Sequence, residues 1–379
     1  MIKRLLALGL CLALLGSLTA CQEAASGEEQ APVSSASTST DLAADTDSAA
    51  ETDTADLSKD PADLSDLLAQ GLDGSGSDSA PAPVEEPEEV TTRAARTYGL
   101  SMPSHPSSTE KATAKALKKY AKAMGDHLVV AEGAETAEEQ RERLNELVAQ
   151  QVSAIFLCPA DAEAMEETVT ALSQQGVAVL GFGNWDYTPE GMVSIVHSDD
   201  YNAGYVCGMD LAEHCPDGGD VLVLERIEYP ALMERCIGFM EAAEESGVDL
   251  QILEELELDG GSKSVTKAVK TVLKESPQVV GIFAPRDKDA AAALAAVEGT
   301  GIWVYGGEGS PELKAKLSTS AAPTNLAGVG AQSPLAVAKT LLQSVNDHLD
   351  GESVEEDQMV GTFLITGKNV KKYGVDQWQ

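Results

Sequence analysis

Residues 152–182 read VSAIFLCPADAEAMEETVTALSQQGVAVLGF and decide the fold class. The apolar run 154–157 ends at a proline-containing turn and is typical of a short buried strand. Apolar residues at helical spacing over 162–174 predict an amphipathic helix, and the apolar run 177–182 predicts a second strand. Strand, helix and strand in this order form the repeating unit of a parallel α/β sheet.

The same alternation extends from Thr97 to Leu349 and restarts after residue 196. Two consecutive series of comparable length predict two lobes. A helix over 287–297 is expected to begin at Asp287, whose carboxylate would accept the first-turn N–H groups. The other expected strands are 127–131, 193–196, 221–224, 250–256, 279–284, 302–305 and 326–330, and the other expected helices are 108–124, 137–151, 201–214, 231–246, 264–274 and 335–349.

The charge of the chain is strongly acidic and unevenly distributed. Its 379 residues contain 62 Asp and Glu against 26 Lys and Arg, a net charge of −36. Residues 22–92 hold 18 of the acidic residues and one basic residue, Lys59, and the rest of the acidity lies in a globular part long enough to bury a substantial core. Nonspecific nucleic-acid binding needs clustered Lys and Arg, so a nucleic-acid partner is not expected.

The N-terminus predicts export and lipid anchoring. Lys3 and Arg4 precede an apolar run that is too short for a membrane span, which is typical of a signal peptide over 1–20. The next residues, Leu18-Thr19-Ala20-Cys21, resemble the lipobox of bacterial lipoproteins, in which the cysteine thiol receives a diacylglycerol and the protein is held on the membrane. The alternative is an ordinary secretory signal with an incidental Cys21. Residues 21–95 are acidic and poor in large apolar residues, and we expect a disordered linker.

Seven segments of the globular part match one known family in register. They are 151–161, Ser198-Asp199-Asp200 with Ala203-Gly204, 235–239, 283–287, 306–310, 331–334 and 365–370. From about Tyr98 to Tyr373 the chain therefore resembles the type I periplasmic sugar-binding proteins, the ribose-binding group that serves ABC importers.

The resemblance implies an α/β fold of two Rossmann-like lobes joined by a three-strand hinge, with the ligand between the lobes. The substrate-binding domain would cover 96–379, with an N-lobe of about 97–200 plus 333–360 and a C-lobe of about 201–332 plus 361–379. The ligand-binding positions carried over are His105, Cys158, Gly183, Asn184, Arg235, Arg286, Glu308 and Gln332. Arg235 would donate a planar fork of hydrogen bonds to ligand oxygens. For each arginine the alternative is an ion pair with a neighbouring carboxylate.

Departures from the family concern the aromatic residues that stack on a sugar ring. Residues 104–108 lack the two phenylalanines of ribose-type proteins, and Gly183-Asn184 stands where those proteins have Asp-Arg. Stacking would have to come from Trp185, Tyr187 or Tyr229, and the alternative for Trp185 is that it only covers its lobe. A zwitterion, a nucleoside or a modified sugar would each suit a pocket with Arg235, Arg286, Asp287 and Glu308.

Motifs for catalysis and metal binding are weak or missing. There is no Gly-x-Ser-x-Gly elbow and no His-Glu-x-x-His, so neither an enzyme nor a metal site is expected, and no cofactor is implied. Buried free thiols are expected for Cys158, Cys207, Cys215 and Cys236, although disulfides among them stay open. The expected function is capture of a small polar, sugar-like solute by a monomer for an ABC permease. The alternative is a sensory protein that presents its ligand to a chemoreceptor or a membrane kinase.

Overall fold

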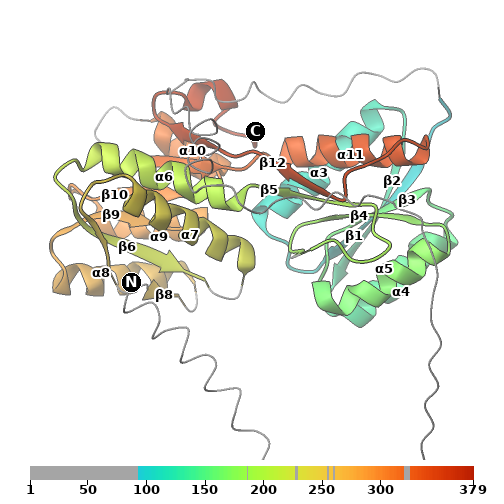
Figure 1. The fold of residues 1–379 in the computed structure, drawn as a ribbon, viewed down its shortest axis with the longest axis horizontal. Helices are drawn as coiled ribbons and strands as arrows, with labels where there is room; N and C mark the ends of the chain where they lie inside the picture. Colours follow the sequence, from blue (N-terminus) through green and yellow to red (C-terminus); the bar gives the residue numbers. More distant parts are fainter. Residues whose placement is uncertain (1–92, 186, 227–228, 254–255, 259–260, 320–324) are drawn as a thin grey trace, which may run out of the picture. The chain divides into compact units, whose positions relative to one another are not determined.

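The computed structural model describes residues 93–379 except 186, 227–228, 254–255, 259–260 and 320–324 (Figure 1). The predicted signal peptide, the predicted lipidation site Cys21 and residues 21–92 of the predicted linker lie outside the described residues. Among the residues that are described, none of the helices combines the length and the apolar character that a membrane span requires.

The first lobe is built on a parallel sheet with strand order β12-β5-β4-β3-β1-β2. Helices α3 and α11 pack on one face of this sheet, and α4 and α5 pack on the other. Because both faces are covered, β3 and β4 are buried at every residue, which explains their continuous apolar sequences. The elements are β1 (Thr97–Pro103), α3 (Ser108–Ala123), β2 (His127–Ala134), α4 (Ala137–Ala149), β3 (Ala154–Leu157), α5 (Ala162–Gln174), β4 (Ala178–Phe182), β5 (Ser194–Ser198), α11 (Pro334–Leu349) and β12 (Asp357–Val360).

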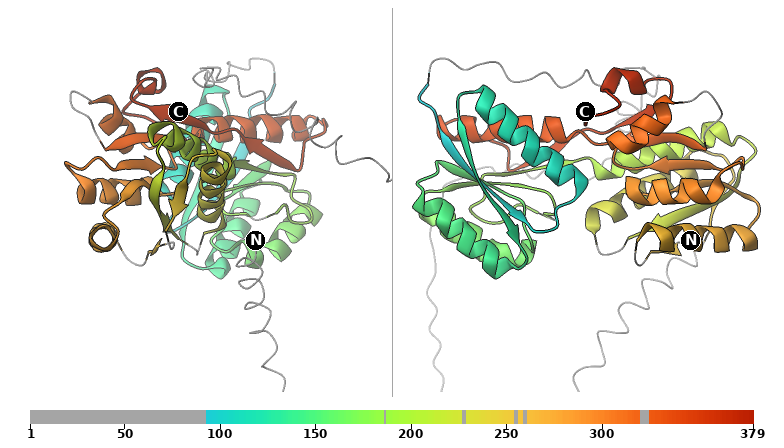
Figure 2. Two further views of the ribbon diagram at one scale, coloured as in Figure 1. Left: turned by 60° about the vertical axis from the view of Figure 1, so that its left-hand side comes forward. Right: turned by 180° about the vertical axis from the view of Figure 1, so that it is seen from behind.

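The second lobe has strand order β13-β11-β10-β9-β6-β7, with β8 paired to β6 and with β13 antiparallel to β11. Helices α6 and α7 lie on the face turned to the viewer in Figure 1, and α8 and α9 lie on the far face, seen from behind in Figure 2. The elements are α6 (Asp200–His214), β6 (Gly219–Glu225), α7 (Pro230–Glu245), β7 (Leu250–Ile252), β8 (Leu256–Glu257), α8 (Ser262–Glu275), β9 (Val279–Phe283), α9 (Asp287–Val297), β10 (Trp303–Gly306), α10 (Pro311–Ser318), β11 (Leu326–Ala331), β13 (Phe363–Thr366) and the 3₁₀ helix η1 (Val370–Tyr373).

The chain passes between the two sheets at three places within the described residues: from β5 into α6, from β11 into α11 and from β12 into β13. The first and third passages are hydrogen-bonded to each other. Asp199 N donates to Val360 O at 2.9 Å, and Thr362 Oγ1 donates to Asp199 O at 2.9 Å. The predicted fold class, an α/β protein of two Rossmann-like lobes, is confirmed.

Three differences from the expected elements have local causes. The single strand expected over 250–256 is two short strands, because β7 pairs with residues 219–221 of β6 and β8 with residues 224–225. Helix α10 was not predicted, although Ser310 caps it and Pro311 occupies its first turn. The Asp287 carboxylate does not cap α9, because its oxygens accept hydrogen bonds from Glu308 N at 3.0 Å and Ser310 N at 2.6 Å.

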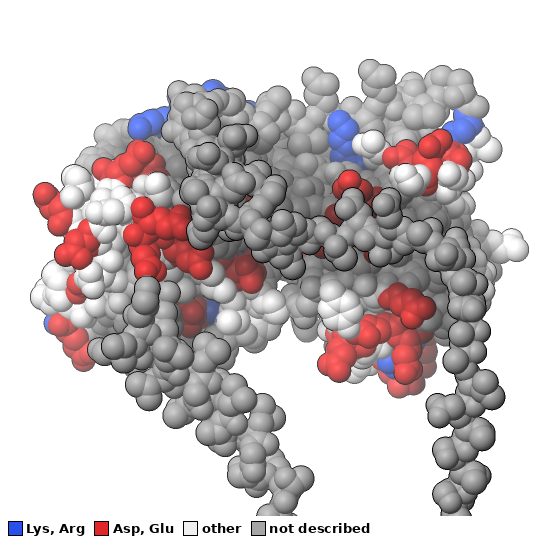
Figure 3. All heavy atoms as spheres, in the orientation of Figure 1, with Lys and Arg blue, Asp and Glu red and all other residues white. Residues whose placement is uncertain are grey.

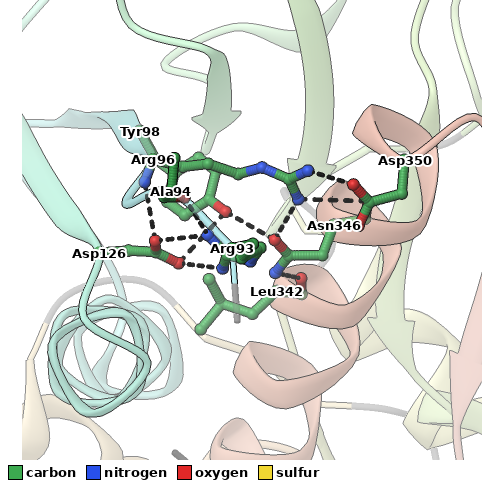
Figure 4. Close-up of polar contacts among 8 residues, drawn as sticks. All are labelled: Arg93, Ala94, Arg96, Tyr98, Asp126, Leu342, Asn346 and Asp350. Atoms are coloured by element: carbon green, nitrogen blue, oxygen red, sulfur yellow. Dashed lines mark hydrogen bonds and ion pairs between the residues drawn. The ribbon is translucent and has the colours of Figure 1, made fainter. Parts of the chain in front are cut away.

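The start of the described chain is fixed to the amino end of β1 by a polar cluster (Figure 4). Arg93 donates to both oxygens of the buried Asp126, at 2.8 and 2.5 Å, and Arg96 N donates to the same carboxylate at 2.8 Å. The Arg96 side chain reaches Asn346 and Asp350 at the end of α11. Burial by itself raises the pKa of Asp126, but the hydrogen bonds from Arg93 and Arg96 outweigh it and lower that pKa.

Candidate ligand-binding site

Arg235, Glu308 and Gln332 meet at the carboxyl ends of the strands of the second sheet. Glu308 follows β10, Gln332 follows β11, and Arg235 lies in the second turn of α7. The carboxyl ends of parallel strands are where open α/β sheets bind ligands, because loops and helix N-termini converge there. All three residues are at most 5% exposed. The predicted members of this lobe therefore form one polar group, with Arg286 at its margin.

Arg235 is the centre of this group. Its Nε donates to Asp200 Oδ1 at 2.7 Å, and one terminal nitrogen donates to Pro285 O at 2.7 Å. Burial by itself lowers the pKa of Arg235, but the carboxylates of Asp200 and Glu308 outweigh it and raise that pKa. The guanidinium is thus charged, held in one orientation, and tied to the N-terminus of α6 and to the loop after β9.

Gln332 carries an unpaired polar atom. Its side-chain nitrogen donates to Asp200 Oδ1 at 2.8 Å, and its backbone N–H donates to Glu308 O at 3.0 Å. Among the described residues, Gln332 Oε1 is the one buried side-chain nitrogen or oxygen that has no hydrogen-bond partner. An unsatisfied buried acceptor costs about 1–3 kcal/mol, so this oxygen would gain from a donor such as a ligand hydroxyl.

Glu308 and Asp287 bond each other reciprocally. Glu308 Oε2 accepts from Asp287 N at 3.0 Å, while Asp287 Oδ1 accepts from Glu308 N at 3.0 Å. Burial, and next the Asp287 carboxylate, raise the pKa of Glu308 to about 7. This carboxyl can therefore accept hydrogen bonds from hydroxyls at neutral pH and donate one at lower pH.

The raised pKa of Glu308 predicts a pH-dependent stability. Because the folded protein holds this proton more tightly than the unfolded chain, the stabilisation is complete below the unfolded pKa of 4.5 and is lost as pH rises through about 7. We expect Glu308→Gln to reduce the loss of unfolding free energy between pH 5 and pH 8, measured by urea denaturation. The exposed Glu142→Gln is the control and should keep the wild-type difference. An identical pH slope in Glu308→Gln and wild type would contradict the assignment.

Arg286 shares a carboxylate with a second arginine. Its Nε and a terminal nitrogen donate to Asp289 at 3.0 and 3.2 Å, and the buried Arg226 donates to the same carboxylate at 2.9 and 3.1 Å. Each predicted arginine of the site is therefore ion-paired. Asp287 was expected in this polar group, but Arg226 and Asp200 were missed, although Arg226 directly follows β6 and Asp200 begins α6, positions from which both could have been proposed.

The predicted residues of the first lobe lie after β1, β3 and β4. Cys158 is fully buried, and burial, with Glu110 as a second cause, raises the pKa of its thiol well above the ordinary value. A side chain at Gly183 would come within 2.8 Å of Cys158 Sγ, and Gly183 has a positive φ of 85°. A glycine is therefore required beside this thiol. His105 and Asn184 are exposed on the loops after β1 and β4.

Trp185 is packed against the core of the first lobe. Its Nε1 donates to Leu157 O at 3.2 Å, and its ring contacts the cluster beneath α4 and α5. Together with Tyr187 and the start of α5 it also lines a surface pocket of about 310 Å³. Tyr187 and Tyr229 are 56% and 46% exposed. In this structure the indole covers its lobe, and its contact with a ligand stays a prediction.

None of the four cysteines in the described part is in a disulfide. Cys158, Cys207 and Cys236 are buried, and Cys215 is partly exposed. The described residues contain no cluster of His, Cys, Asp and Glu that could hold a metal ion.

Comparison with known proteins places this geometry in a family. Residues 98–353 match the family model described as periplasmic binding protein domain. The chain belongs to this family. A curated relative is the ribose import binding protein RbsB of Bacillus subtilis (strain 168), which is 25% identical over 258 residues, 67% of this chain and 82% of that protein.

Solved structures of periplasmic binding proteins share the fold of this family member. An ABC transporter solute-binding protein from Bradyrhizobium sp. BTAi1, with bound bis-tris, has a TM-score of 0.69 at 15% identity and covers 78% of this chain and 89% of its own. One from Actinobacillus succinogenes 130z, with bound D-allose, has a TM-score of 0.66 at 20% identity and covers 73% and 100%. The resemblance to type I binding proteins is therefore confirmed at the level of fold and family.

Proposed function

We propose that the protein is a lipid-anchored extracytoplasmic binding protein that captures a small polar, sugar-like solute for an ABC importer. The observation that carries this proposal is the unpaired Gln332 Oε1, buried beside the fixed Arg235–Asp200 pair. A ligand hydroxyl would supply the missing donor to Gln332, while Glu308 adds a carboxyl that can accept or donate a hydrogen bond. A polyol offers hydroxyls that do both.

The relatives support a sugar rather than another polar solute. RbsB is named for ribose import, and solved structures of the same fold hold D-allose and α-D-tagatopyranose. The site agrees with a neutral ligand, because Arg235 and Arg286 each already face a carboxylate. A charged ligand would have to compete with Asp200 or Asp289 for its arginine. The contributions of His105, Cys158, Asn184 and Trp185 from the first lobe remain part of this proposal.

A thermal-shift screen tests the ligand class. A ligand that binds only the folded state raises the unfolding temperature in proportion to RT ln(1 + [L]/Kd). We expect D-ribose, D-allose or another neutral pentose or hexose to stabilise the protein, and we expect Gln332→Leu to remove this response. Gln251→Leu, on an exposed position of β7, is the control that should keep it. Stabilisation by amino acids or nucleosides alone would overturn the sugar assignment.

Anchoring through Cys21 is tested separately. Two acyl chains give stable membrane attachment where one chain is marginal. We expect Cys21→Ala to move the protein from the membrane fraction to the soluble fraction after cell lysis. Cys11→Ala, within the predicted signal peptide, should leave the protein on the membrane. A Cys21→Ala variant that still sediments with membranes would refute the lipid anchor and leave the ligand assignment untouched.

A further inference from the structure

Exposed apolar side chains gather on the outer surface of α6 and α7. Four of the six exposed large hydrophobic residues among the described residues lie there: Met209, Tyr229, Met233 and Ile237, at 36%, 46%, 38% and 36% exposure. Along α7, Tyr229, Met233 and Ile237 are spaced by four and therefore form one stripe of the helix. A row of exposed apolar side chains along one helix is a candidate interaction site.

Helix α6 continues the same surface with a second stripe. Tyr201, Tyr205 and Met209 are also spaced by four, and the two tyrosine rings stack with centroids 5.9 Å apart. The hydroxyl of Tyr201 donates to Glu241 at 2.8 Å, and that of Tyr205 donates to Glu245 at 3.1 Å. Glu241 and Glu245 extend the α7 stripe by the same spacing of four. The two stripes thus form one surface, here named the α6–α7 face: Tyr201, Tyr205, Met209, Tyr229, Met233 and Ile237.

The α6–α7 face is built on two helices whose backbones touch. A Cβ at Gly204 would lie 1.8 Å from Arg235 O, and a Cβ at Gly238 would lie 2.0 Å from Tyr201 O. The helices therefore cannot slide or roll without losing this contact. A partner would meet a preformed surface and would pay little ordering entropy on binding.

The exposed charged side chains within and beside this face are acidic. Five exposed glutamates belong to α6 and α7: Glu213, Glu234, Glu241, Glu244 and Glu245. The only Lys or Arg of these two helices is Arg235, which is buried and paired with Asp200. Figure 3 shows carboxylates gathered where Figure 1 places α6 and α7.

We propose that the α6–α7 face docks a protein partner whose contact surface has an apolar centre flanked by Lys and Arg. Charge decides among the possible occupants. A second copy would bring the same glutamates and would be repelled. The segment 22–92 carries 18 acidic residues against one lysine, so it would be repelled as well. An anionic bilayer is excluded for the same reason. A partner surface with an apolar centre and basic flanks would bury the apolar side chains of this face, and its Lys and Arg would pair with the glutamates. Tyr229 is also a candidate stacking residue, but the positions tested below, Met233, Ile237, Glu241 and Glu245, lie outside the residues proposed to bind the ligand.

Two designed helical peptides of equal length test the proposal with the full-length protein. Both carry the same leucine stripe, flanked by lysines in one and by glutamates in the other, and binding is measured by fluorescence anisotropy. We expect only the lysine peptide to bind, and we expect Met233→Ser with Ile237→Ser to weaken it about tenfold, as loss of a central apolar contact does. Glu241→Gln with Glu245→Gln should also weaken it.

The matched control is Glu142→Gln with Glu146→Gln on α4, which removes the same charge at the same spacing from exposed positions. It should leave the lysine peptide's affinity within about twofold of wild type. Equal weakening by both pairs of substitutions would show that the lysine peptide is attracted only by the overall negative charge of the protein, and this would overturn the proposal. It would also be overturned if Ile237→Ser abolished a dimer in sedimentation, or abolished binding to phosphatidylglycerol vesicles, since the face would then serve another copy or a membrane.

Discussion

Arg235→Ala is expected to lower the free energy of unfolding by about 3–5 kcal/mol, the usual cost of removing one partner from a buried ion pair. The side chains of Arg235 and Asp200 are 5% and 16% exposed, and their atoms are 2.7 Å apart. The substitution would leave Asp200 with Gln332 alone and would deprive Pro285 O of its donor. The family resemblance implied that Arg235 donates hydrogen bonds to a ligand, and the alternative was an ion pair with a neighbouring carboxylate. The ion pair shows that this residue also joins α6, α7 and the loop after β9.

Urea denaturation of Arg235→Ala, with Arg286→Ala as the control, checks this expectation. Arg286 is partly exposed, and its partner Asp289 keeps the buried Arg226, so Arg286→Ala should cost only about 1 kcal/mol. Ligand response must be measured at a temperature where Arg235→Ala is still folded by circular dichroism. Arg235→Lys keeps the charge but loses the fork of donors, so a folded Arg235→Lys without ligand response would separate binding from stability. A wild-type urea midpoint for Arg235→Ala would exclude the structural role.

The parts of the fold that could be predicted were those in which local pattern and tertiary environment agree. Helix α5 was predicted with both of its ends, because Asp161 caps it, an apolar face runs along it, and buried strands flank it. Short elements could not be found in the same way. Strand β12, with the sequence DQMV, has neither an apolar run nor an alternation, and it forms because β5 offers an edge for pairing.

In the candidate site, residue types were predictable and partners were not. Glu308 and Gln332 were proposed from the family resemblance, because they stand in two of its matching segments, 306–310 and 331–334. The bond of Gln332 to Asp200 joins residues that are 132 positions apart, and no local pattern encodes it. The role of Asp287 was predicted wrongly for the same reason. Its carboxylate could accept hydrogen bonds from the first turn of its own helix or from the turn after β10. It bonds the turn after β10, because the N–H groups of Glu308 and Ser310 there are buried and partly buried, respectively, and need an acceptor.

Gly238→Ala is expected to be among the most damaging small substitutions in the second lobe. Its added methyl group would lie 2.0 Å from Tyr201 O and 2.9 Å from Tyr201 C, so it would meet the backbone of α6 rather than a side chain that can turn away. The helices must then separate, which strains the Arg235–Asp200 pair and both Tyr–Glu hydrogen bonds between them. Overpacking costs about 1–3 kcal/mol, occasionally more, and a rigid backbone contact puts this site at the upper end. The gain of less than about 1 kcal/mol from alanine's better helix propensity cannot offset it.

Urea unfolding of Gly238→Ala, compared with Gly301→Ala, isolates this effect. A Cβ at Gly301 would have no atom within 4 Å, so Gly301→Ala should stay within about 0.5 kcal/mol of wild type. Gly204→Ala, whose methyl group would lie 1.8 Å from Arg235 O on the opposite helix, should reproduce the loss seen in Gly238→Ala. Because both glycines serve one contact, the double variant should lose less than the sum of the two single losses. Full additivity, or a Gly238→Ala variant as stable as Gly301→Ala, would show that α6 and α7 do not depend on this close approach.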